Sequence, residues 1–465
     1  MEKLKADIVI IGSGPSGQKA AIQGSKAGKK VIVVEREDEP GGACLFSGTI
    51  PSKTFREAII DLSRLNERAF YEGTIARDEV TISLLNERLH KVIDDEKAMI
   101  YRQFRRNNIQ LLQGTARFET PHTLHVVDEK FKISYCLEAE YFIIATGSLP
   151  RNPHEIPFDD RVILDSTRLL ALDRIPKSLL VLGGGVIGSE YASFFAILGT
   201  EVTIVDRQSH ILPMLDSEMG VHLQTALTEI GVKFIGKRTP DTISKKDGRA
   251  HVVLNDGREL EADALLFALG RTANVEGLQI DKAGVMLDGK GYVKVNPLFQ
   301  TTLPHIYAVG DVIGGPCLAS TSMEQGRLAM RHIVGAQTHY FPYNYPVGIY
   351  TIPEISSCGM TEERVKELNF NYEVGRAYYY EIARSHIAGT NTGLLKLIFH
   401  ADTLELLGVH ALGSGATELI HIGQMAMHFN AKIDHFIDQV FNYPTYAETY
   451  RVAALNGINK IQYKK

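Results

Sequence analysis

This sequence has few cysteines, no net positive charge and no long apolar run, and each of these features argues against a class of protein. Only 4 of the 465 residues are cysteine, and none lies in a C-x-x-C or other metal-ligand spacing. The sequence therefore predicts neither a disulfide framework nor a metal site, and it fits a reducing cytoplasm. The formal net charge of −5 argues against non-specific binding of nucleic acid, which requires a basic surface. No uninterrupted apolar run reaches the roughly 18 residues that a membrane span needs, so no membrane partner is expected.

The remaining composition is ordinary for a globular protein of several domains. The chain is 44% hydrophobic and 23% charged, and its length predicts two to four domains. After MEKLKA the sequence enters DIVIIGSGPSG, which predicts a folded strand and turn rather than a signal peptide. We therefore expect a cytoplasmic protein.

Residues 6–36 have the pattern of a complete βαβ unit that binds a dinucleotide. Residues 8–11 form an apolar run typical of a strand buried on both faces in a parallel sheet. Such a strand is followed here by the spacing G-x-G-x-x-G, formed by Gly12, Gly14 and Gly17. The first glycine permits a tight turn, the second lets the backbone approach a pyrophosphate, and the third lets the helix pack on the strand. A second strand, residues 31–34, ends at Glu35, whose carboxylate is placed to accept the hydroxyls of an adenosine ribose.

The same pattern returns at residues 178–207. Residues 179–182 and 202–205 read as buried strands, and Asp206 follows the second of them. The glycines of this unit are Gly183, Gly185 and Gly188. One such motif is a modest indication of nucleotide binding, because a Gly-rich turn also occurs without a ligand. Two complete units in one chain favour two bound dinucleotides.

Three further segments predict the strands that complete the two sheets. YFIIATGS and ALLFALGR read as buried strands that run into small-residue turns, and Gly147 and Gly270 in these turns are candidate cofactor contacts. HIYAVGDV reads as a strand that ends at Asp311. A carboxylate at the carboxyl end of a strand lies where open α/β sheets bind ligands, although an aspartate there also serves as a simple helix cap.

Together these segments resemble the flavoprotein family that binds two dinucleotides, which includes glutathione reductase and dihydrolipoamide dehydrogenase. The resemblance spans essentially the whole chain. It implies an α/β fold in which two Rossmann-like, three-layer domains bind FAD and NAD(P), followed by a C-terminal α+β dimerisation domain. By position it implies that the FAD diphosphate and ribose are bound by Gly12, Gly14, Gly17 and Glu35, the ribityl chain by Asp311, and the nicotinamide cofactor by Gly183, Gly185 and Gly188.

The resemblance also divides the chain. The FAD-binding domain is expected to be discontinuous, at residues 1–150 and 273–340, with the NAD(P)-binding domain at 151–272 between them. Residues 341–465 change to antiparallel-like strands (LLKLIFH, LELLGVHAL) and then a helix (ATELIHIGQMAMHF), so this part is expected to form the interface of a homodimer or higher homo-oligomer. His421, in that apolar helix, is expected to be a buried structural histidine rather than a catalytic one.

Two departures from the family pattern remove its disulfide chemistry. The family has C-x4-C where this chain has Cys44 and Thr49, and its signature H-P-T-x-x-E begins here with Tyr443. A thiol–disulfide relay requires a second sulfur and a base that titrates near neutral pH, and a tyrosine with an ordinary pKa of about 10 does not replace histidine. We expect Cys44 to remain beside the flavin as a small side chain, with a reactive thiolate near a helix N-terminus as the alternative. We expect the segments that contain Cys136, Cys317 and Cys358 to lie elsewhere. No substitute bridge to Cys44 is therefore expected.

This combination resembles one branch of the family, the soluble (Si-specific), flavin-dependent pyridine nucleotide transhydrogenases. The segments that carry the resemblance are GTIPSK, AVGDVIG, GIYTIPEISS, IHIGQ and FNYPTYAETYRVAALNGINK. It implies reversible, ping-pong hydride transfer: NADPH reduces FAD, NADP⁺ leaves, and NAD⁺ enters to take the hydride. The implied cofactors are FAD, NAD(H) and NADP(H). The alternative left open is an NAD(P)H oxidase, or a reductase of quinones or other electron acceptors.

Within this resemblance a few side chains acquire roles. Lys53 aligns with a lysine whose ammonium lies near flavin N5, where a cation would stabilise the anionic reduced flavin, and Glu190 aligns with its ion-pair partner. A helix that begins near Ala319 would direct its N-terminal dipole at the flavin pyrimidine ring. Asp206 would bond the 2′-hydroxyl of NAD(H), and the adjacent Arg207 would pair with a 2′-phosphate. Dual cofactor use is therefore expected, with an NAD-selective enzyme left open.

Overall fold

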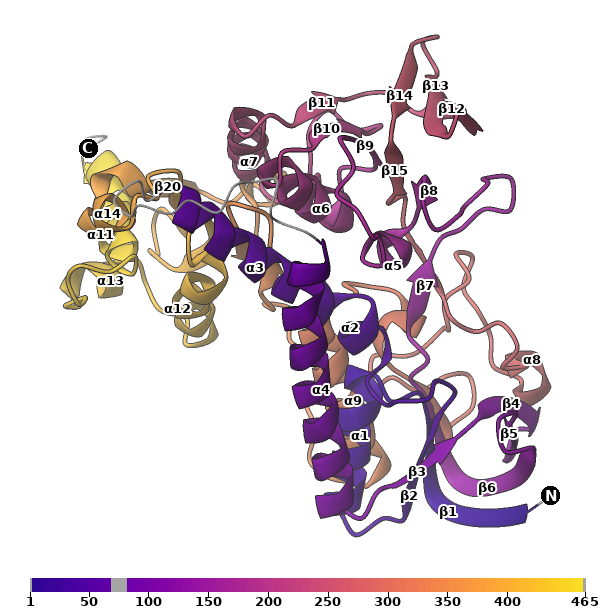
Figure 1. Ribbon diagram of the computed structural model, residues 1–465. Coiled ribbons are helices and arrows are strands. Elements are labelled where there is room, and N and C mark those ends of the chain that lie inside the picture. The colour runs from indigo at the N-terminus through magenta and orange to yellow at the C-terminus, as the bar shows by residue number, and fades with distance from the viewer. Residues whose placement is uncertain (1, 68–81, 463–465) are drawn as a thin grey trace.

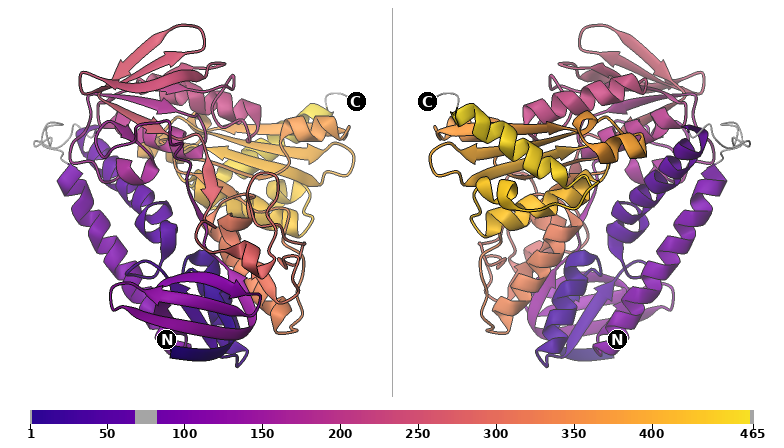
Figure 2. Two further views of the ribbon diagram at one scale, coloured as in Figure 1. Left: turned by 90° about the vertical axis from the view of Figure 1, so that its right-hand side faces the viewer. Right: turned by 90° about the vertical axis from the view of Figure 1, so that its left-hand side faces the viewer.

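The computed structural model describes residues 2–67 and 82–462 of the chain as three modules, each built around one main sheet (Figure 1). The N-terminal module lies at the bottom of Figure 1, the middle module at the upper right and the C-terminal module at the upper left. Figure 2 shows the middle and C-terminal modules side by side above the N-terminal sheet. The fold is thus α/β for the first two sheets, with a C-terminal α+β module, as the sequence predicts.

The N-terminal module contains a sheet of order β3-β2-β1-β6-β5-β4, in which β17 also pairs with β6. Strands β3, β2, β1, β6 and β17 are parallel, whereas β4 and β5 form an antiparallel hairpin against β6. The strands are β1 Glu2–Ile11, β2 Val31–Glu35, β3 Gln110–Gln113, β4 Thr115–Thr120, β5 Thr123–Asp128, β6 Ile133–Ile144 and β17 Ile306–Ala308. The helices are α1 Pro15–Lys26, α2 Gly42–Phe46, α3 Thr49–Glu67, α4 Ile82–Arg106, α8 Ile280–Ala283, the 3₁₀ turn η2 Gly310–Ile313 and α9 Ala319–Ile333.

Strand β1 is apolar on both sides because its two faces enter different cores. Ile8 and Ile10 pack toward α1, α4 and α9, while Val9 and Ile11 pack toward the β4–β5 hairpin and α8. The sheet is therefore the middle of three layers. The strand predicted over residues 8–11 is confirmed, and it extends back to Glu2 because residues 2–6 pair with residues 135–139 of β6.

The middle module repeats this plan with a smaller sheet of order β11-β10-β9-β15-β8, which is parallel throughout. A separate antiparallel sheet of order β12-β13-β14 covers one face and α6 covers the other. The strands are β8 Ile163–Leu164, β9 Ser178–Leu182, β10 Glu201–Val205, β11 Lys233–Ile235, β12 Pro240–Lys246, β13 Arg249–Leu254, β14 Glu259–Ala262 and β15 Ala264–Phe267. The helices are α5 Ser166–Leu169, α6 Val186–Ile197 and α7 Ser217–Glu229.

The chain enters and leaves the middle module through a two-stranded antiparallel ribbon of β7 (Ser148–Pro150) and β16 (Arg271–Ala273). The N-terminal module is consequently discontinuous, because β17 and α9 return to it after the middle module. Helix α9 begins at Ala319, as predicted, and packs against α1 at very short range. A Cβ on Gly326 would stand 2.1 Å from the Ser16 carbonyl oxygen, so only glycine fits at that crossing.

The C-terminal module is an antiparallel sheet of order β18-β19-β22-β21-β20 flanked by helices α12 and α14. Its strands are β18 Val347–Ile349, β19 Ile355–Gly359, β20 Tyr372–Tyr378, β21 Leu394–His400 and β22 Leu406–Leu412. Its helices are α10 Glu362–Glu367, the 3₁₀ turn η3 Tyr379–Glu381, α11 Ala383–Ala388, α12 Ala416–His428, α13 Asp434–Asp438 and α14 Glu448–Gln462. No helix in the described part of the chain is both long and apolar enough to cross a bilayer.

A buried charge cluster joins the middle module to the C-terminal sheet. The Lys396 side chain on β21 is 1% exposed, and its Nζ lies 2.9 Å from Asp216, 2.8 Å from Glu218 and 2.7 Å from Glu362. Arg376 on β20 adds a bidentate pair to Glu218, with both N–O distances at 2.7 Å. Burial alone would raise the pKa of the Glu218 carboxyl, but hydrogen bonds from Arg376 and Lys396 outweigh it and lower that pKa to about 2.

Lys396→Ala is expected to destabilise the protein by about 3–5 kcal/mol, because it leaves three carboxylates without their common buried cation. The matched control is Lys366→Ala, whose side chain is 59% exposed and pairs with the same Glu362; it should cost at most about 1 kcal/mol. Urea unfolding at pH 7 measures the free energy of unfolding of both variants.

The Glu218 and Glu362 pKa values of about 2 lie below the values these groups have in the unfolded chain. This stabilisation is therefore present above about pH 4.3 and lost as pH falls toward 2. Equal stability of Lys396→Ala and Lys366→Ala at pH 7 would contradict the assignment of Lys396 as the central cation of the cluster.

Candidate functional site

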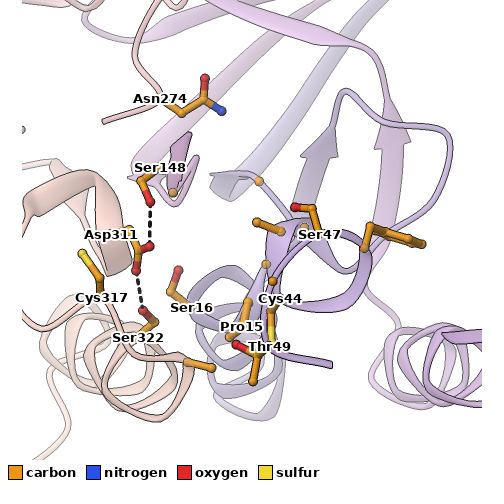
Figure 3. Close-up of a pocket in the computed structure, with 18 of the residues that line it drawn as sticks. Pro15, Ser16, Cys44, Ser47, Thr49, Ser148, Asn274, Asp311, Cys317 and Ser322 are labelled. Carbon is orange, nitrogen blue, oxygen red and sulfur yellow. Dashed lines mark hydrogen bonds between the residues drawn. The ribbon is translucent and has the colours of Figure 1, made fainter. Parts of the chain in front are cut away.

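A cavity of about 980 Å³ lies where the three modules meet. Figure 3 shows part of its wall, with side chains from the first turn, helix α2 and the segment around Asp311 facing one space. The cavity is lined by nine of the residues singled out from the sequence, namely Gly12, Gly14, Glu35, Cys44, Lys53, Gly147, Glu190, Asp311 and Ala319. The other candidates lie outside its lining, namely Gly17, Gly183, Gly185, Gly188, Asp206, Arg207 and Gly270.

The first Gly-rich turn is held by contacts that only glycine permits. Gly12 has φ +105°, and a Cβ there would stand 2.4 Å from the Ala145 carbonyl oxygen. A Cβ on Gly17 would stand 2.0 Å from the Gly12 carbonyl oxygen, which fixes how closely α1 approaches β1. Gly14, in contrast, has nothing within 4 Å of its Cβ position and faces the cavity. Two of the glycines therefore shape the turn, and the third leaves its outer side open to a ligand.

The acid at the end of β2 closes the same turn. The Glu35 carboxylate accepts hydrogen bonds from the Ser13 amide at 2.9 Å and the Ser13 hydroxyl at 2.5 Å, and its other oxygen accepts from the Glu37 amide at 3.1 Å. Ser13 was not among the sequence candidates. Its signal is its place between the first two glycines of the motif, where a hydroxyl meets the strand-end carboxylate. The ribose-binding role of Glu35 stays a prediction.

The middle module reproduces this turn. A Cβ on Gly188 would stand 1.9 Å from the Gly183 carbonyl oxygen, while Gly185 has open space at its Cβ position. The Asp206 carboxylate accepts from the Gly184 amide at 2.6 Å and from the Gln208 amide at 2.7 Å. Both halves of the chain thus have the same cradle: a strained first glycine, a close third glycine, an open second glycine and a carboxylate that ties the turn.

Asp311 lies on η2 and is oriented by side chains that sequence reasoning missed. Its Oδ2 accepts a hydrogen bond from the Ser148 hydroxyl at 2.7 Å, and its Oδ1 lies 3.5 Å from the Ser322 hydroxyl on α9 (Figure 3). Arg271 in turn donates to the Ser148 hydroxyl at 2.8 Å and to the Ser148 carbonyl at 2.7 Å. This relay joins the β7–β16 ribbon to the wall of the cavity. Its serines, Ser148 in β7 and Ser322 in α9, carried no motif that singled them out in the sequence.

Lys53 and Glu190 form the ion pair that the resemblance implies. The Lys53 ammonium on α3 lies 2.8 and 2.7 Å from the two Glu190 oxygens on α6. Glu190 also accepts the Tyr350 amide at 2.9 Å, and the Lys53 ammonium stands 5.1 Å from the centre of the Tyr350 ring. The Glu190 side chain is 4% exposed and that of Lys53 is 24% exposed. Both side chains line the cavity, and the ammonium is the more exposed member of the pair.

The structure places Cys44 at the cavity and corrects the expected position of Cys317. All four are free thiols, and Cys44 lines the cavity beside Thr49 (Figure 3). Burial raises the pKa of the Cys44 thiol above its ordinary value, although a hydrogen bond with Thr49 opposes this, so the neutral thiol dominates at pH 7. Cys317 was expected to lie elsewhere, but it lines the same cavity near Asp311. Cys317 lies in sequence between Asp311 and Ala319, which were both expected at the flavin, so its position could have been inferred from spacing.

His421 is also corrected. It was expected to be a buried core residue, but it is exposed, bonds to Gln424 at 2.8 Å, and contributes to the lining of the cavity from α12. The buried residues of α12 are Ala416, Thr417, Leu419, Ile420, Gly423 and Met427. Position 421 lies one turn after Thr417, at the margin of that face, so the overall apolarity of the helix does not decide whether its side chain is covered.

The residues of the cavity fit FAD. The Thr146 hydroxyl oxygen is buried at the cavity wall and has no hydrogen-bond partner within the described part of the chain, so it is free to meet a ligand. The helices α1 and α9 both begin at the cavity, through Ser16 and Ala319, and supply amide groups suited to negative charge. No group of three or more metal-ligating side chains occurs among the described residues.

Comparison with known proteins identifies the family of this chain. The family described as pyridine nucleotide-disulphide oxidoreductase matches residues 6–326, and its dimerisation domain matches residues 345–454. The chain belongs to this family. Its members are flavoprotein oxidoreductases, so FAD and a pyridine nucleotide are the cofactors.

Similar proteins come from several bacteria. The chain is 42% identical to the soluble pyridine nucleotide transhydrogenase of Mycobacterium bovis BCG and 40% identical to that of Salmonella paratyphi B, over 98% of each chain. Its structure superposes on the HOCl-induced flavoprotein disulfide reductase RclA from Escherichia coli with a TM-score of 0.86 at 28% identity, covering 97% of this chain and 99% of the other.

Gly17→Ala should reduce bound flavin to roughly a tenth or less, because the new Cβ displaces the turn. The displaced turn loses hydrogen bonds from backbone N–H groups to phosphate, each worth about 1.5–3 kcal/mol. Gly188→Ala, the same change in the second turn, should keep flavin and weaken nicotinamide binding instead. Flavin absorbance per chain and NADPH titration separate the two. Gly289→Ala, where a Cβ meets nothing within 4 Å, is the control. Flavin retained by Gly17→Ala would contradict the assignment of the first turn.

Proposed function

We propose that the protein transfers hydride reversibly between NADPH and NAD⁺ through FAD, with the two nicotinamides alternating at one site. The observation that carries the proposal is that Cys44 has no disulfide partner. Cys44 has Thr49 where a disulfide relay needs a second sulfur, and all four cysteines are free. Electrons that reach the flavin then have no sulfur couple to pass to, and a second nicotinamide is the acceptor. The names of the 42% and 40% identical relatives support this reading.

FAD, when bound, supplies the hydride chemistry: it accepts a hydride from one nicotinamide and gives it to the next. The protein's part is binding, orientation and electrostatics. NADH and NADPH differ only at the 2′ position of the adenosine ribose, far from the ring, so the exchange is nearly thermoneutral. The reaction therefore needs no strongly exergonic step. The Lys53 ammonium of the Lys53–Glu190 pair has only to stabilise negative charge nearby.

The site residues take their proposed roles from the two cradles. The first cradle (Gly12, Gly14, Gly17, Glu35), together with Gly147, Asp311 and Ala319, would hold FAD. The second cradle (Gly183, Gly185, Gly188, Asp206), together with Arg207 and Gly270, would hold the nicotinamide nucleotide. The same proposal assigns residues 1–150 and 273–340 to FAD, residues 151–272 to NAD(P), and residues 341–465 to the interface of a homodimer.

A direct assay tests the proposal. The holoenzyme is mixed anaerobically with NADPH and an NAD⁺ analogue whose reduced form absorbs at a shifted wavelength, and reduction of the analogue is expected. Initial rates at several concentrations of both substrates should give parallel double-reciprocal lines, as ping-pong exchange at one site requires. Intersecting lines would contradict alternation at one site. No analogue reduction, with rapid oxygen consumption in air, would favour the oxidase alternative.

Lys53→Met should keep bound FAD and slow its reduction by NADPH about 10²-fold, because a fixed cation in a partly dry site stabilises developing negative charge. The single change also leaves Glu190 buried and unpaired, so the double variant Lys53→Met/Glu190→Gln is the companion. Stopped-flow bleaching of the flavin band is the measurement, and Lys26→Met, at an exposed position on α1, is the control. Normal reduction in the double variant would show that Lys53 only neutralises Glu190.

A further inference from the structure

A second hollow, separate from the flavin cavity, lies at the surface beside α9, and we call it the aromatic cleft. Its volume is about 250 Å³. Its lining consists of five aromatic rings, three prolines and one amide side chain, namely Pro297, Phe299, Pro316, Gln325, Tyr340, Phe341, Pro342, Tyr343 and Tyr345. None of these residues lines the flavin cavity, and the proposed hydride transfer uses none of them.

The part of the wall formed by Phe299 is held by the backbone. Phe299 has φ +67°, a left-handed conformation that a bulky residue rarely adopts. The turn around it is closed by the Asn296 side chain, whose oxygen accepts the Leu298 amide at 2.9 Å and the Gln300 amide at 3.0 Å. The Phe299 ring packs nearly perpendicular to that of Phe341, with 6.4 Å between the ring centroids. This wall is therefore formed before any ligand arrives.

The segment 340–345, YFPYNY, supplies most of the remaining rings. Phe341 contacts Tyr345, with 5.8 Å between their centroids. Tyr340 and Tyr343 are 67% and 94% exposed. Within the described residues, neither of these two rings contacts another aromatic ring and neither hydroxyl makes a hydrogen bond. The fold thus leaves two tyrosine rings at the rim of the cleft unused, and such rings are suited to stacking on a flat ligand.

One buried polar side chain lies among these apolar residues. Gln325 on α9 is 6% exposed, and its Oε1 accepts the Gly310 amide at 2.8 Å. That hydrogen bond requires the oxygen on this side, so the orientation of the side-chain amide is fixed. The Nε2 group donates no hydrogen bond within the described part of the chain, yet it is not sealed from solvent. Because Gln325 lines the cleft, its N–H groups are available to an acceptor there.

The size and chemistry of the cleft restrict what it can hold. Pockets for drug-sized molecules measure roughly 300–1,000 Å³, so a hollow of about 250 Å³ fits one or two fused rings. Specific protein interfaces bury about 800 Å² per partner, which is more than such a hollow offers. The aromatic walls favour a flat aromatic ligand. The buried polar group is a donor, so the matching group on the ligand is an acceptor such as a carbonyl.

We propose that the aromatic cleft binds a planar bicyclic aromatic compound that carries a ring carbonyl. The ring stacks on the exposed tyrosines, Tyr340 and Tyr343, and the carbonyl accepts a hydrogen bond from Gln325. The site is distinct from both nucleotide cradles. It does not rest on the proposed function, because binding there requires neither hydride transfer nor a nicotinamide.

Calorimetric titration of the oxidised holoenzyme with chromone tests the site. The matched ligand is 2H-chromene, which has the same two fused rings without the ring carbonyl. Chromone is expected to bind about three- to tenfold more tightly than 2H-chromene, the advantage that one hydrogen bond supplies. No reductant is present, so the result is independent of whether the protein reduces the NAD⁺ analogue.

Two variants locate the bound ring. Gln325→Glu keeps an oxygen for the Gly310 amide but replaces the N–H donors, so it should abolish the advantage of chromone. Bound flavin per chain should not change, because the hydrogen bond beside Asp311 is kept. Tyr343→Ala removes an exposed ring and should weaken both ligands about three- to tenfold. The control is Tyr380→Ala, which removes a 56% exposed tyrosine on η3 and should leave both affinities unchanged.

Several outcomes would overturn the proposal. One is that chromone does not bind, and another is that it binds equally well to the wild type, Gln325→Glu and Tyr343→Ala. Chromone binding that excess NAD⁺ abolishes would place the ring in the nucleotide site instead. Conversion of dimer to monomer by Tyr343→Ala, measured by light scattering, with no loss of chromone affinity would show that a second copy of the chain covers the cleft.

Discussion

The buried pair of Lys53 and Glu190 is the contact on which the geometry of this protein depends, because it joins all three modules at one point. Lys53 comes from α3, Glu190 from α6, and the Tyr350 amide that completes the carboxylate comes from the C-terminal module. A carboxylate only 4% exposed has few other ways to recover its lost hydration, so each of these donors is held in place. Displacing any of the three elements would leave a charge or an amide unsatisfied.

The same junction continues through other polar contacts. Ser193 on α6 accepts the Ile352 amide at 3.1 Å, and Arg56 on α3 donates to the Thr351 carbonyl at 3.2 Å. The Lys396 cluster repeats this principle at the far side of the middle module. Apolar packing supplies the separate cores of the three modules, while hydrogen-bonded charges set their mutual positions. Directional bonds suit this task, since they fix angles as well as distances between the modules that line the cavity.

The sequence anticipated what depends on local pattern and missed what depends on tertiary folding. Both G-x-G-x-x-G turns follow from backbone limits that act within 25 residues, and the structure confirms their strands and helices. The start of α9 at Ala319 was likewise predictable. Cys317 was misplaced although it lies in sequence between Asp311 and Ala319, which were both expected at the flavin; the error was to judge the cysteine apart from its neighbours. His421 was misplaced for a different reason: its helix was judged by overall apolarity, whereas its buried face alone decides which side chains are covered.

Comparison of the two cradles shows how one design acquires two ligands. The parts that fix the turn are the same in both halves, because a strained glycine, a close glycine and a capping carboxylate are needed wherever a backbone must approach a pyrophosphate. The parts that differ lie one or two residues beyond, where side chains reach solvent and cost the fold little. The segments that begin at the acid differ, and read EREDE at 35–39 and DRQSH at 206–210. The turn is common to both units because the backbone requires it, whereas the largely exposed residues beyond it are under no such constraint.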